Sequence, residues 1–149
     1  MASANRETVR DALAALLEAA LTGSGKPVQA VYGYLKSDLA GQSPVVMVQS
    51  AGIRREMASA SDDWDNVMRF ELLAWVMDAN EASGWTDANV DDAVDAVEAA
   101  IADVIAANRR NDNWDELVYA DEFTRLLQVT VGSTPYVLER IPVLVTVLD

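Results

Sequence analysis

Residues 66–77 alternate between two kinds of side chain, and this alternation constrains the fold more than any other feature of the sequence. Successive side chains of a strand point to opposite faces, so the segment is predicted to be a strand with one face in the core. The other face mixes charge with large apolar groups, which is typical of a sheet surface partly covered by something else, such as another subunit. The core set is Met68, Phe70, Leu72, Ala74 and Val76, and the mixed set is Val67, Arg69, Glu71, Leu73, Trp75 and Met77.

Two segments carry apolar residues at steps of three and four, the spacing of an amphipathic helix. The first runs from about Asn5 to Leu21 and ends at the turn-forming residues 22–25. The second runs from Thr86, a good N-cap residue, to about Asn108. We expect its apolar line to lie on the sheet, and that line comprises Val90, Ala93, Val94, Val97, Ile101, Val104 and Ile105.

The remaining β-rich segments complete a sheet. Between two of them, Ser50 to Asp65 shows no apolar period, so we interpret it as a long connection between antiparallel strands. Pro142 cannot donate to a ladder, which predicts an edge or a bulge at that point of the last strand. The order α-β-β-long loop-β-α-β-β indicates a single α+β domain over residues 1–149, with a mainly antiparallel sheet packed with two helices. The additional strands are expected at 28–35, 45–49, 123–131 and 136–148.

Composition excludes several kinds of chemistry. The 149 residues contain no cysteine and no histidine, so thiol catalysis, thiolate zinc sites and histidine-based triads cannot be built. A net charge of −13 disfavours nonspecific binding to nucleic acid and to anionic membranes. The sequence has no run of about 18 apolar residues, so we predict no membrane span, and its first residues show no signal-peptide pattern. We therefore predict no catalytic residues, no cofactor and no metal.

The acids are concentrated in one stretch, because no basic residue lies between Arg69 and Arg109. Four of these acids follow one flank of the second helix, where like charges repel slightly, so the flank must face water, a basic partner or a charged channel. Asp62, Asp63 and Asp65 could bind a hard cation, but their spacing fits a calcium loop poorly and a solvated loop better. The acids of the flank are Asp87, Asp91, Asp95 and Glu98.

The order, spacing and character of several segments resemble the tail terminator, or tail completion, proteins of long-tailed bacteriophages of the lambdoid type. The resemblance spans nearly the whole chain, although none of its motifs is specific alone. It lies in the N-terminal helix, the strand 43–48, the acidic loop 62–65 running into the strand 69–76, the Asp-rich helix from Thr86, and the closing hairpin that ends at 139–145.

The resemblance implies a small α+β subunit of the virion, made in the bacterial host cytoplasm, that forms a hexameric ring at the head-proximal end of the tail tube. Such a ring ends tube growth and joins the tail to the neck. Its partners are copies of itself, the tail tube protein and the head–tail connector or neck protein, while DNA passes through without specific binding and no membrane is involved. We expect a subunit or partner interface at Arg54, Arg55, Glu56, Trp64, Arg69, Glu71 and Trp75, and an acidic lumen or partner face at Asp87, Asp91, Asp95 and Glu98.

Other interpretations stay open at this point. A head–tail connector, a stopper or another neck protein has a similar size and element order. An acidic adaptor domain for a basic partner predicts a monomer, and an enzyme predicts a pocket with converging carboxylates. The excess of acids over lysines is also compatible with adaptation to a saline habitat.

Overall fold

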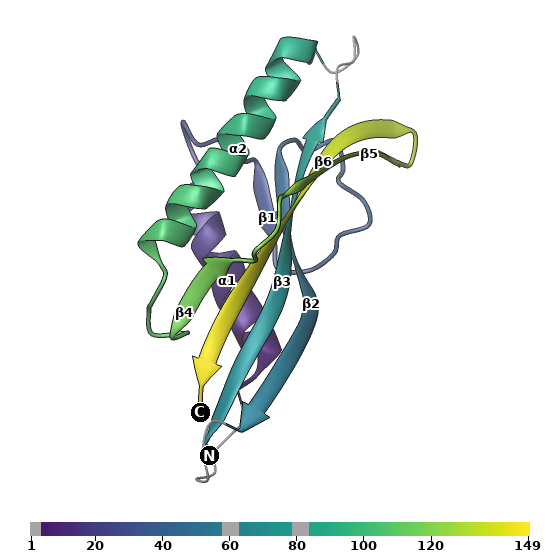
Figure 1. Cartoon of the computed structure of the whole chain (residues 1–149). Coiled ribbons are helices and arrows are strands. Elements are labelled where there is room, and N and C mark those ends of the chain that lie inside the picture. Colours follow the sequence, from purple (N-terminus) through teal and green to yellow (C-terminus); the bar gives the residue numbers. More distant parts are fainter. Residues whose placement is uncertain (1–3, 58–62, 79–83) are drawn as a thin grey trace.

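The computed structural model describes residues 4–57, 63–78 and 84–149. It confirms the α+β class and adds one short strand, β4, that the sequence did not predict (Figure 1). The elements are α1 (Arg6–Leu21), β1 (Ala30–Tyr32), β2 (Val45–Met57), β3 (Trp64–Met77), α2 (Asp87–Ala107), β4 (Glu116–Tyr119), β5 (Arg125–Val131) and β6 (Thr134–Leu148).

One sheet contains all the strands, in the order β1-β2-β3-β6-β4, with β5 pairing along another part of β6. The long strands β2, β3 and β6 run side by side, and β3 is antiparallel to both of its neighbours (Figure 1). Only β1 pairs in parallel, and it contacts just the first three residues of β2. The sheet is therefore mainly antiparallel, as the sequence predicted.

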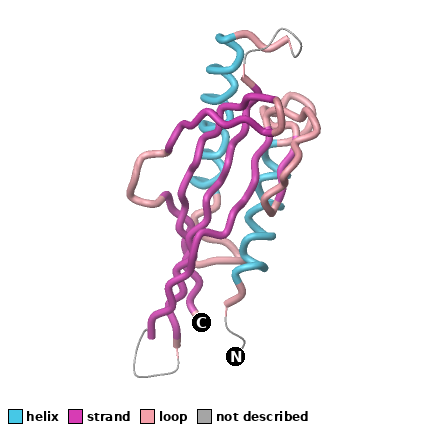
Figure 2. Tube along the Cα trace, turned by 90° about the vertical axis from the view of Figure 1, so that its right-hand side faces the viewer, coloured by secondary structure: helices cyan, strands magenta, loops and turns pink. Residues whose placement is uncertain are grey.

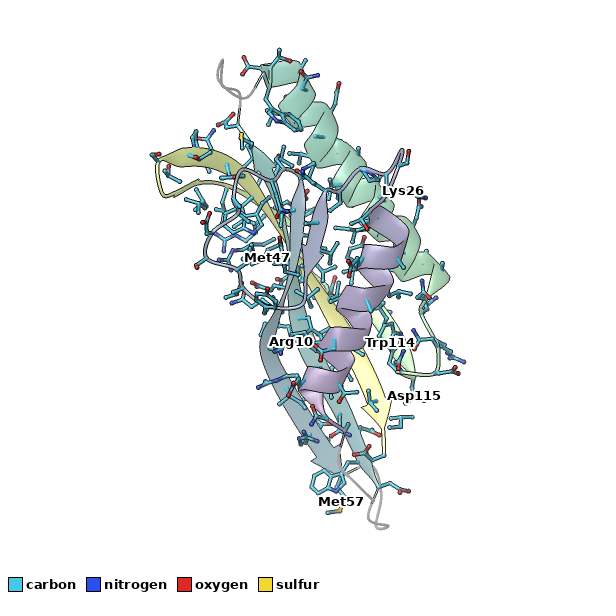
Figure 3. All side chains as sticks on the ribbon, turned by 180° about the vertical axis from the view of Figure 1, so that it is seen from behind. Arg10, Lys26, Met47, Met57, Trp114 and Asp115 are labelled. Atoms are coloured by element: carbon cyan, nitrogen blue, oxygen red, sulfur yellow. The ribbon has the colours of Figure 1, made fainter. Side chains whose placement is uncertain are left out.

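Both helices begin at the expected residues because a side-chain oxygen satisfies an exposed backbone amide at each N-terminus. Asn5 Oδ1 accepts a hydrogen bond of 3.1 Å from the amide of Thr8 in α1. Thr86 and Asn89 form a reciprocal capping box at the start of α2. The first helix lies along one side of the strands in Figure 2, and it crosses in front of them when seen from behind in Figure 3.

The main core lies between these helices and one face of the sheet. The predicted core set of β3 is buried, and Phe70 and Leu72 have no exposed surface. This confirms the alternation of residues 66–77. The cluster comprises residues of α1 (Val9, Leu13, Leu17 and Leu21), of α2 (Val97, Ile101, Val104 and Ile105), and of β3 and β6 (Met68, Phe70, Leu72, Ile141, Val143 and Val145).

The predicted long connection from Ser50 to Asp65 is wrong. Instead, β2 continues to Met57 and pairs with the first residues of β3, with Met57 opposite Trp64. The apolar alternation is lost there because the register shifts between Ser50 and Gly52, and because residues 54–57 are exposed. Residues 58–62, including Asp62 of the cation alternative, lie outside the described residues. The predicted strand at 28–35 is also shorter than expected, since only Ala30–Tyr32 pairs.

Pro142 lies where the neighbour of β6 changes. Pairing with β4 ends at Val143, pairing with β5 begins at Arg140, and Pro142 lies between them. Its carbonyl accepts a hydrogen bond of 3.0 Å from the amide of Ala120. The N–H and C=O of one strand residue point to the same side, so the position where Pro142 lacks an N–H also faces away from β3. The missing N–H therefore costs no hydrogen bond of the β3–β6 ladder. This position is locally an edge, as predicted.

A second buried cluster lies on the sheet face opposite the helices, at the end where β3 finishes. The β5–β6 hairpin and the connection between β1 and β2 cover this part of the face, and Leu39 supplies a buried side chain from that connection. The remainder of the face has no helix over it among the described residues. The cluster consists of Leu39, Val45, Met47, Leu73, Met77, Tyr136 and Leu138.

Candidate functional site

The sheet face opposite the helices, here called the open face, carries the mixed side chains predicted from the alternation in β3. In Figure 1 α1 lies behind the strands, so the open face is turned toward the viewer. Arg69 and Glu71 are half-buried here, between the second cluster and the end of the sheet. The register places Glu71 opposite Pro142, and Leu73 opposite Arg140, so β6 adds a further arginine to this surface.

Charged side chains on the open face form a connected group. Arg140 Nη1 lies 2.9 Å from Glu71 Oε2, and Arg69 Nη2 lies 2.6 Å from Glu122 Oε1. Arg69 is also 3.9 Å from Glu71, which links the two pairs. The four side chains keep between 20% and 47% of their surface exposed, so each pair contributes at most about 1 kcal/mol to stability. Their main effect is to fix the positions of the guanidinium groups.

The same group lines a pocket of about 340 Å³, here called the arginine pocket. Arg125 lies directly opposite Arg140 in the β5–β6 ladder, and it makes no ion pair with any described residue. Like charges placed directly opposite each other in a sheet are unfavourable. The pocket is lined by Arg69, Glu71, Glu122, Phe123, Arg125, Leu127, Arg140 and Pro142.

Trp75 lies on the open face but packs within the second cluster. Its ring meets Tyr136 edge to face, with ring centroids 6.1 Å apart and an interplanar angle of 88°. Such a pair contributes roughly 0.5–1.5 kcal/mol beyond the area that it buries. Part of the indole is exposed, so Trp75 both closes the cluster and reaches the surface.

Three buried polar atoms on the open face have no hydrogen-bond partner among the described residues. They are Gln49 Oε1, Trp75 Nε1 and Arg140 Nε. Gln49 lies opposite Glu71 in the ladder, so the three side chains belong to neighbouring rows of one surface. Most buried polar groups in native proteins are satisfied, so this face holds unused hydrogen-bonding capacity.

The structure places Arg54 and Arg55 on opposite sides of the sheet, because they are successive residues of β2. Arg54 is exposed on the open-face side and pairs with Glu56 at 3.1 Å. Arg55 points to the helix side, where it donates hydrogen bonds to Asn66 Oδ1 at 2.9 Å and to the carbonyl of Ala4 at 3.0 Å. Of the two, only Arg54 shares a face with Arg69.

Arg55 is part of a closure at the end of the sheet where the chain termini meet. Asn66 is fully buried there, and its amide donates to the carbonyl of Val147 at 3.0 Å and to Asp149 Oδ2 at 3.1 Å. Beyond this closure three large apolar side chains are exposed: Met57, labelled in Figure 3, Trp64 and Leu148, by 60%, 39% and 55%. Met57 and Trp64 lie opposite each other in the ladder and share one side, whereas Leu148 pairs with Asp65 and lies on the other side. Trp64 thus belongs to a different surface from Arg69, Glu71 and Trp75.

The acidic flank of α2 lies on the side of the molecule opposite the arginine pocket, because α2 packs on the helix face of the sheet. Asp87, Asp91 and Asp95 are exposed, as a solvated flank requires. Glu98 is half-buried instead, because it faces the strands.

Glu98 lies near a buried carboxylate, Glu139 of β6, which is only 6% exposed. Burial raises the pKa of Glu139 above its ordinary value, the hydrogen bond of 2.6 Å from Thr124 Oγ1 lowers it, and the Glu98 and Asp95 carboxylates raise it. Burial, then Glu98, Glu139 and Asp103, also raise the pKa of Tyr119. We did not predict this group of acidic side chains from the sequence. The alternation of β6 does indicate it, because Glu139 falls between Val137 and Ile141 on the core face.

Several residues of the open face were missed for a related reason. Arg125 and Arg140 belong to predicted strands, but only the register between those strands shows that they lie opposite each other and near Arg69. Glu122 and Phe123 lie in the connection between β4 and β5, because β5 begins at Arg125 and not at Phe123 as predicted. The alternation over 123–131 had already placed Phe123 and Arg125 on one face, and this was the signal available in the sequence.

Nothing in the described parts of the chain assembles a metal-binding group of histidine, cysteine, aspartate or glutamate side chains. Among the same residues, no helix has both the length and the apolar character needed to cross a membrane. The arrangement on the open face offers hydrogen bonds, charge and apolar surface.

Comparisons with protein families and with curated proteins found no match. A search of solved structures found similarity to a chain described as "Virion of native gene transfer agent (GTA) particle". The two chains are 16% identical, the similarity covers 90% of this chain and 84% of that chain, and the TM-score is 0.44. With this sequence identity and this TM-score, the similarity does not assign a family or a function.

Proposed function

We propose that this chain is a structural virion subunit that assembles with copies of itself into a ring. In this proposal the ring contains six copies and caps the head-proximal end of the tail tube of a long-tailed phage. It ends tube growth and joins the tail to the neck, as the sequence resemblance implies. The subunit acts through its surfaces and transforms no molecule.

The observation that carries the proposal is the open face. It combines an ordered group of ion pairs with a pocket that three arginines line, and no described helix covers it. In an isolated chain the exposed Arg125 lies opposite Arg140 with no ion-pair partner among the described residues, which is unfavourable. Contact with another protein can supply that partner. We therefore assign Arg69, Glu71 and Trp75 to a subunit interface, together with Arg54 and Glu56 at its margin.

Arg55 and Trp64 take different places in this scheme. Arg55 holds the terminal closure through Asn66 and the carbonyl of Ala4, so it supports the interface only indirectly. Trp64 and Met57 lie opposite each other at the end of the ladder, and these two exposed apolar side chains offer a contact surface for a neighbouring component such as the tail tube or the neck.

Two positions in a ring suit the acidic flank of α2. It could line the channel, where like charge prevents DNA from adhering, or it could face a neighbouring subunit. Replacing Asp91 and Asp95 together by lysine separates the two. A channel wall predicts normal rings and slower DNA passage, whereas a subunit contact predicts weaker ring formation.

Electron microscopy of the purified chain tests the ring directly. Negatively stained particles are expected to be closed rings of uniform diameter. Adding the rings to growing tail tubes should shorten the tubes and leave a ring at one end. Tubes that grow to the same length distribution with and without the chain would contradict the role in tail termination, whatever the shape of the particles.

A further inference from the structure

The arginine pocket contains one more guanidinium group than carboxylates. Arg69, Arg125 and Arg140 line it together with Glu71 and Glu122, so positive charge exceeds negative charge in a chain whose net charge is −13. Arg69 and Arg140 each have a glutamate partner, but Arg125 has none among the described residues and lies opposite Arg140. A carboxylate from outside the described chain would relieve this repulsion and pair with Arg125.

The rim of the same pocket carries an exposed aromatic side chain. Phe123, which lines the pocket, is 95% exposed. The position of Phe123 is fixed by its two neighbours: Glu122 pairs with Arg69 on the open face, and Thr124 donates to Glu139 on the helix side. A phenylalanine held in water by an ordered connection is a suitable anchor for a partner surface.

The outer surface of α2 has the complementary character. Apart from Asn89, its exposed side chains are aspartates and alanines, so it presents negative charge together with small apolar groups. Small side chains let an aromatic ring approach a helix closely, while the aspartates reach past it toward guanidinium groups. The exposed residues of α2 that matter here are Asp87, Ala88, Asp91, Asp95, Ala96 and Ala99.

We propose that the arginine pocket of one copy receives the acidic flank of α2 from a second copy. In this contact an aspartate of the flank pairs with Arg125, and Phe123 lies against the exposed alanines. The inference rests on the proposed self-assembly and assigns the acidic flank to a subunit contact. A second copy is the occupant that the charges favour, because each copy carries both members of the pair.

The two members lie on opposite faces of one sheet, so each copy uses a different surface toward each of its two neighbours. A contact of this type is heterologous, and its repetition gives a closed ring or an open filament. It cannot give an isolated two-fold dimer. The contact therefore accounts for a ring without requiring any symmetry within the subunit.

Charge reversal with mixing tests the pairing. The first variant is Arg125→Glu, and the second combines Asp91→Lys with Asp95→Lys. The association of each variant is measured by sedimentation in low salt. Each variant alone is expected to associate about a hundredfold more weakly than the wild type, because like charges then meet at the contact. An equimolar mixture of the two should assemble again, because each then offers the surface that the other needs.

Matched controls carry the same charge changes elsewhere. Arg110→Glu and Asp112→Lys alter exposed residues outside the arginine pocket and the flank, and they should assemble as the wild type does. Chemical unfolding should show that every variant is folded. Raised salt should weaken wild-type association.

The outcomes distinguish the pairing from the ring itself. Unchanged assembly of both reversal variants, or a mixture that stays dissociated, would overturn the pairing and leave the ring in place. A wild-type chain that stays single at every concentration would overturn both proposals. Restored assembly in the mixture, with normal controls, supports the pairing.

Discussion

The two phenylalanines of this chain lie in opposite environments, and comparing them shows how the two faces of the sheet differ. Phe70 lies under both helices with no exposed surface, whereas Phe123 stands beside the open face with 95% of its surface exposed. The helix face buries apolar side chains and thereby stabilises the subunit. The open face retains polar atoms and an aromatic side chain that the subunit itself does not use.

This comparison separates folding from assembly. Substitutions on the helix face should change the free energy of unfolding, because they remove buried contacts. Substitutions at the arginine pocket should leave that free energy almost unchanged and alter the association of copies instead. The four changes below test this separation, from the largest expected effect on stability to the smallest.

Phe70→Ala is expected to destabilise the subunit most. The side chain is fully buried between the helices and the sheet, so its loss removes apolar burial and leaves a cavity. The expected cost is about 3–5 kcal/mol, measured by urea unfolding. A cost below about 1 kcal/mol would mean that the helices do not pack on this face as described.

Asn66→Ala should have a smaller but clear effect. The change removes a buried amide that accepts from Arg55 and donates to Val147 and Asp149, and it leaves the carbonyl of Val147 without that partner. We expect a loss of about 1–3 kcal/mol. Exposed Asn113→Ala serves as the control, and equal stability of the two variants would contradict the terminal closure.

Glu139→Gln should stabilise the subunit at neutral pH. The pKa of Glu139 is raised above its ordinary value of 4.5, so the folded chain holds the proton more tightly than the unfolded chain. The stability that this group contributes is therefore complete below the unfolded pKa and is lost as pH rises through the folded pKa.

The variant should thus gain stability relative to the wild type at pH 7 and match it at pH 4, in thermal unfolding at both values. Glutamine can still accept the hydrogen bond from Thr124. Glu116→Gln, an exposed change on β4, is the control. A difference between variant and wild type that is the same at both pH values would show that the surroundings do not raise the pKa of Glu139.

Phe123→Ala should change stability least, by less than about 0.5 kcal/mol, because the ring makes little buried contact in the subunit. Its expected effect is on association, which should weaken by roughly tenfold or more if the ring is an anchor. The readout is the concentration at which copies assemble. If Phe123→Ala destabilised the subunit as much as Phe70→Ala does, the proposed difference between the two faces would be wrong.

Local patterns in the sequence were sufficient for the elements that pack against each other. The alternation through Met68, Phe70 and Leu72 predicted the core face of β3, and the apolar line from Val90 to Ile105 predicted the buried side of α2. The helix start at Thr86 followed from capping chemistry, which depends only on residues in one turn. These features are local, so the sequence alone contains them.

The parts that were not predicted depend on contacts between distant segments. The extension of β2 to Met57 is stabilised by pairing with Trp64 and its neighbours, and a bulge near Gly52 hides the alternation. The short strand β4 carries only four residues and forms because β6 offers an edge. The arginine pocket likewise exists only once β3, β5 and β6 are in register, so single-segment patterns identified Arg69 and Glu71 but not Arg125 and Arg140.

Sedimentation of the wild-type chain over a wide range of concentration tests the central claim most directly. If the open face is an unsatisfied interface between copies, mass should rise with concentration from one copy to a single closed assembly and then stop. Raising the salt concentration should shift this transition to higher protein concentration. A mass of one copy at every concentration, in low salt as in high, would contradict the account.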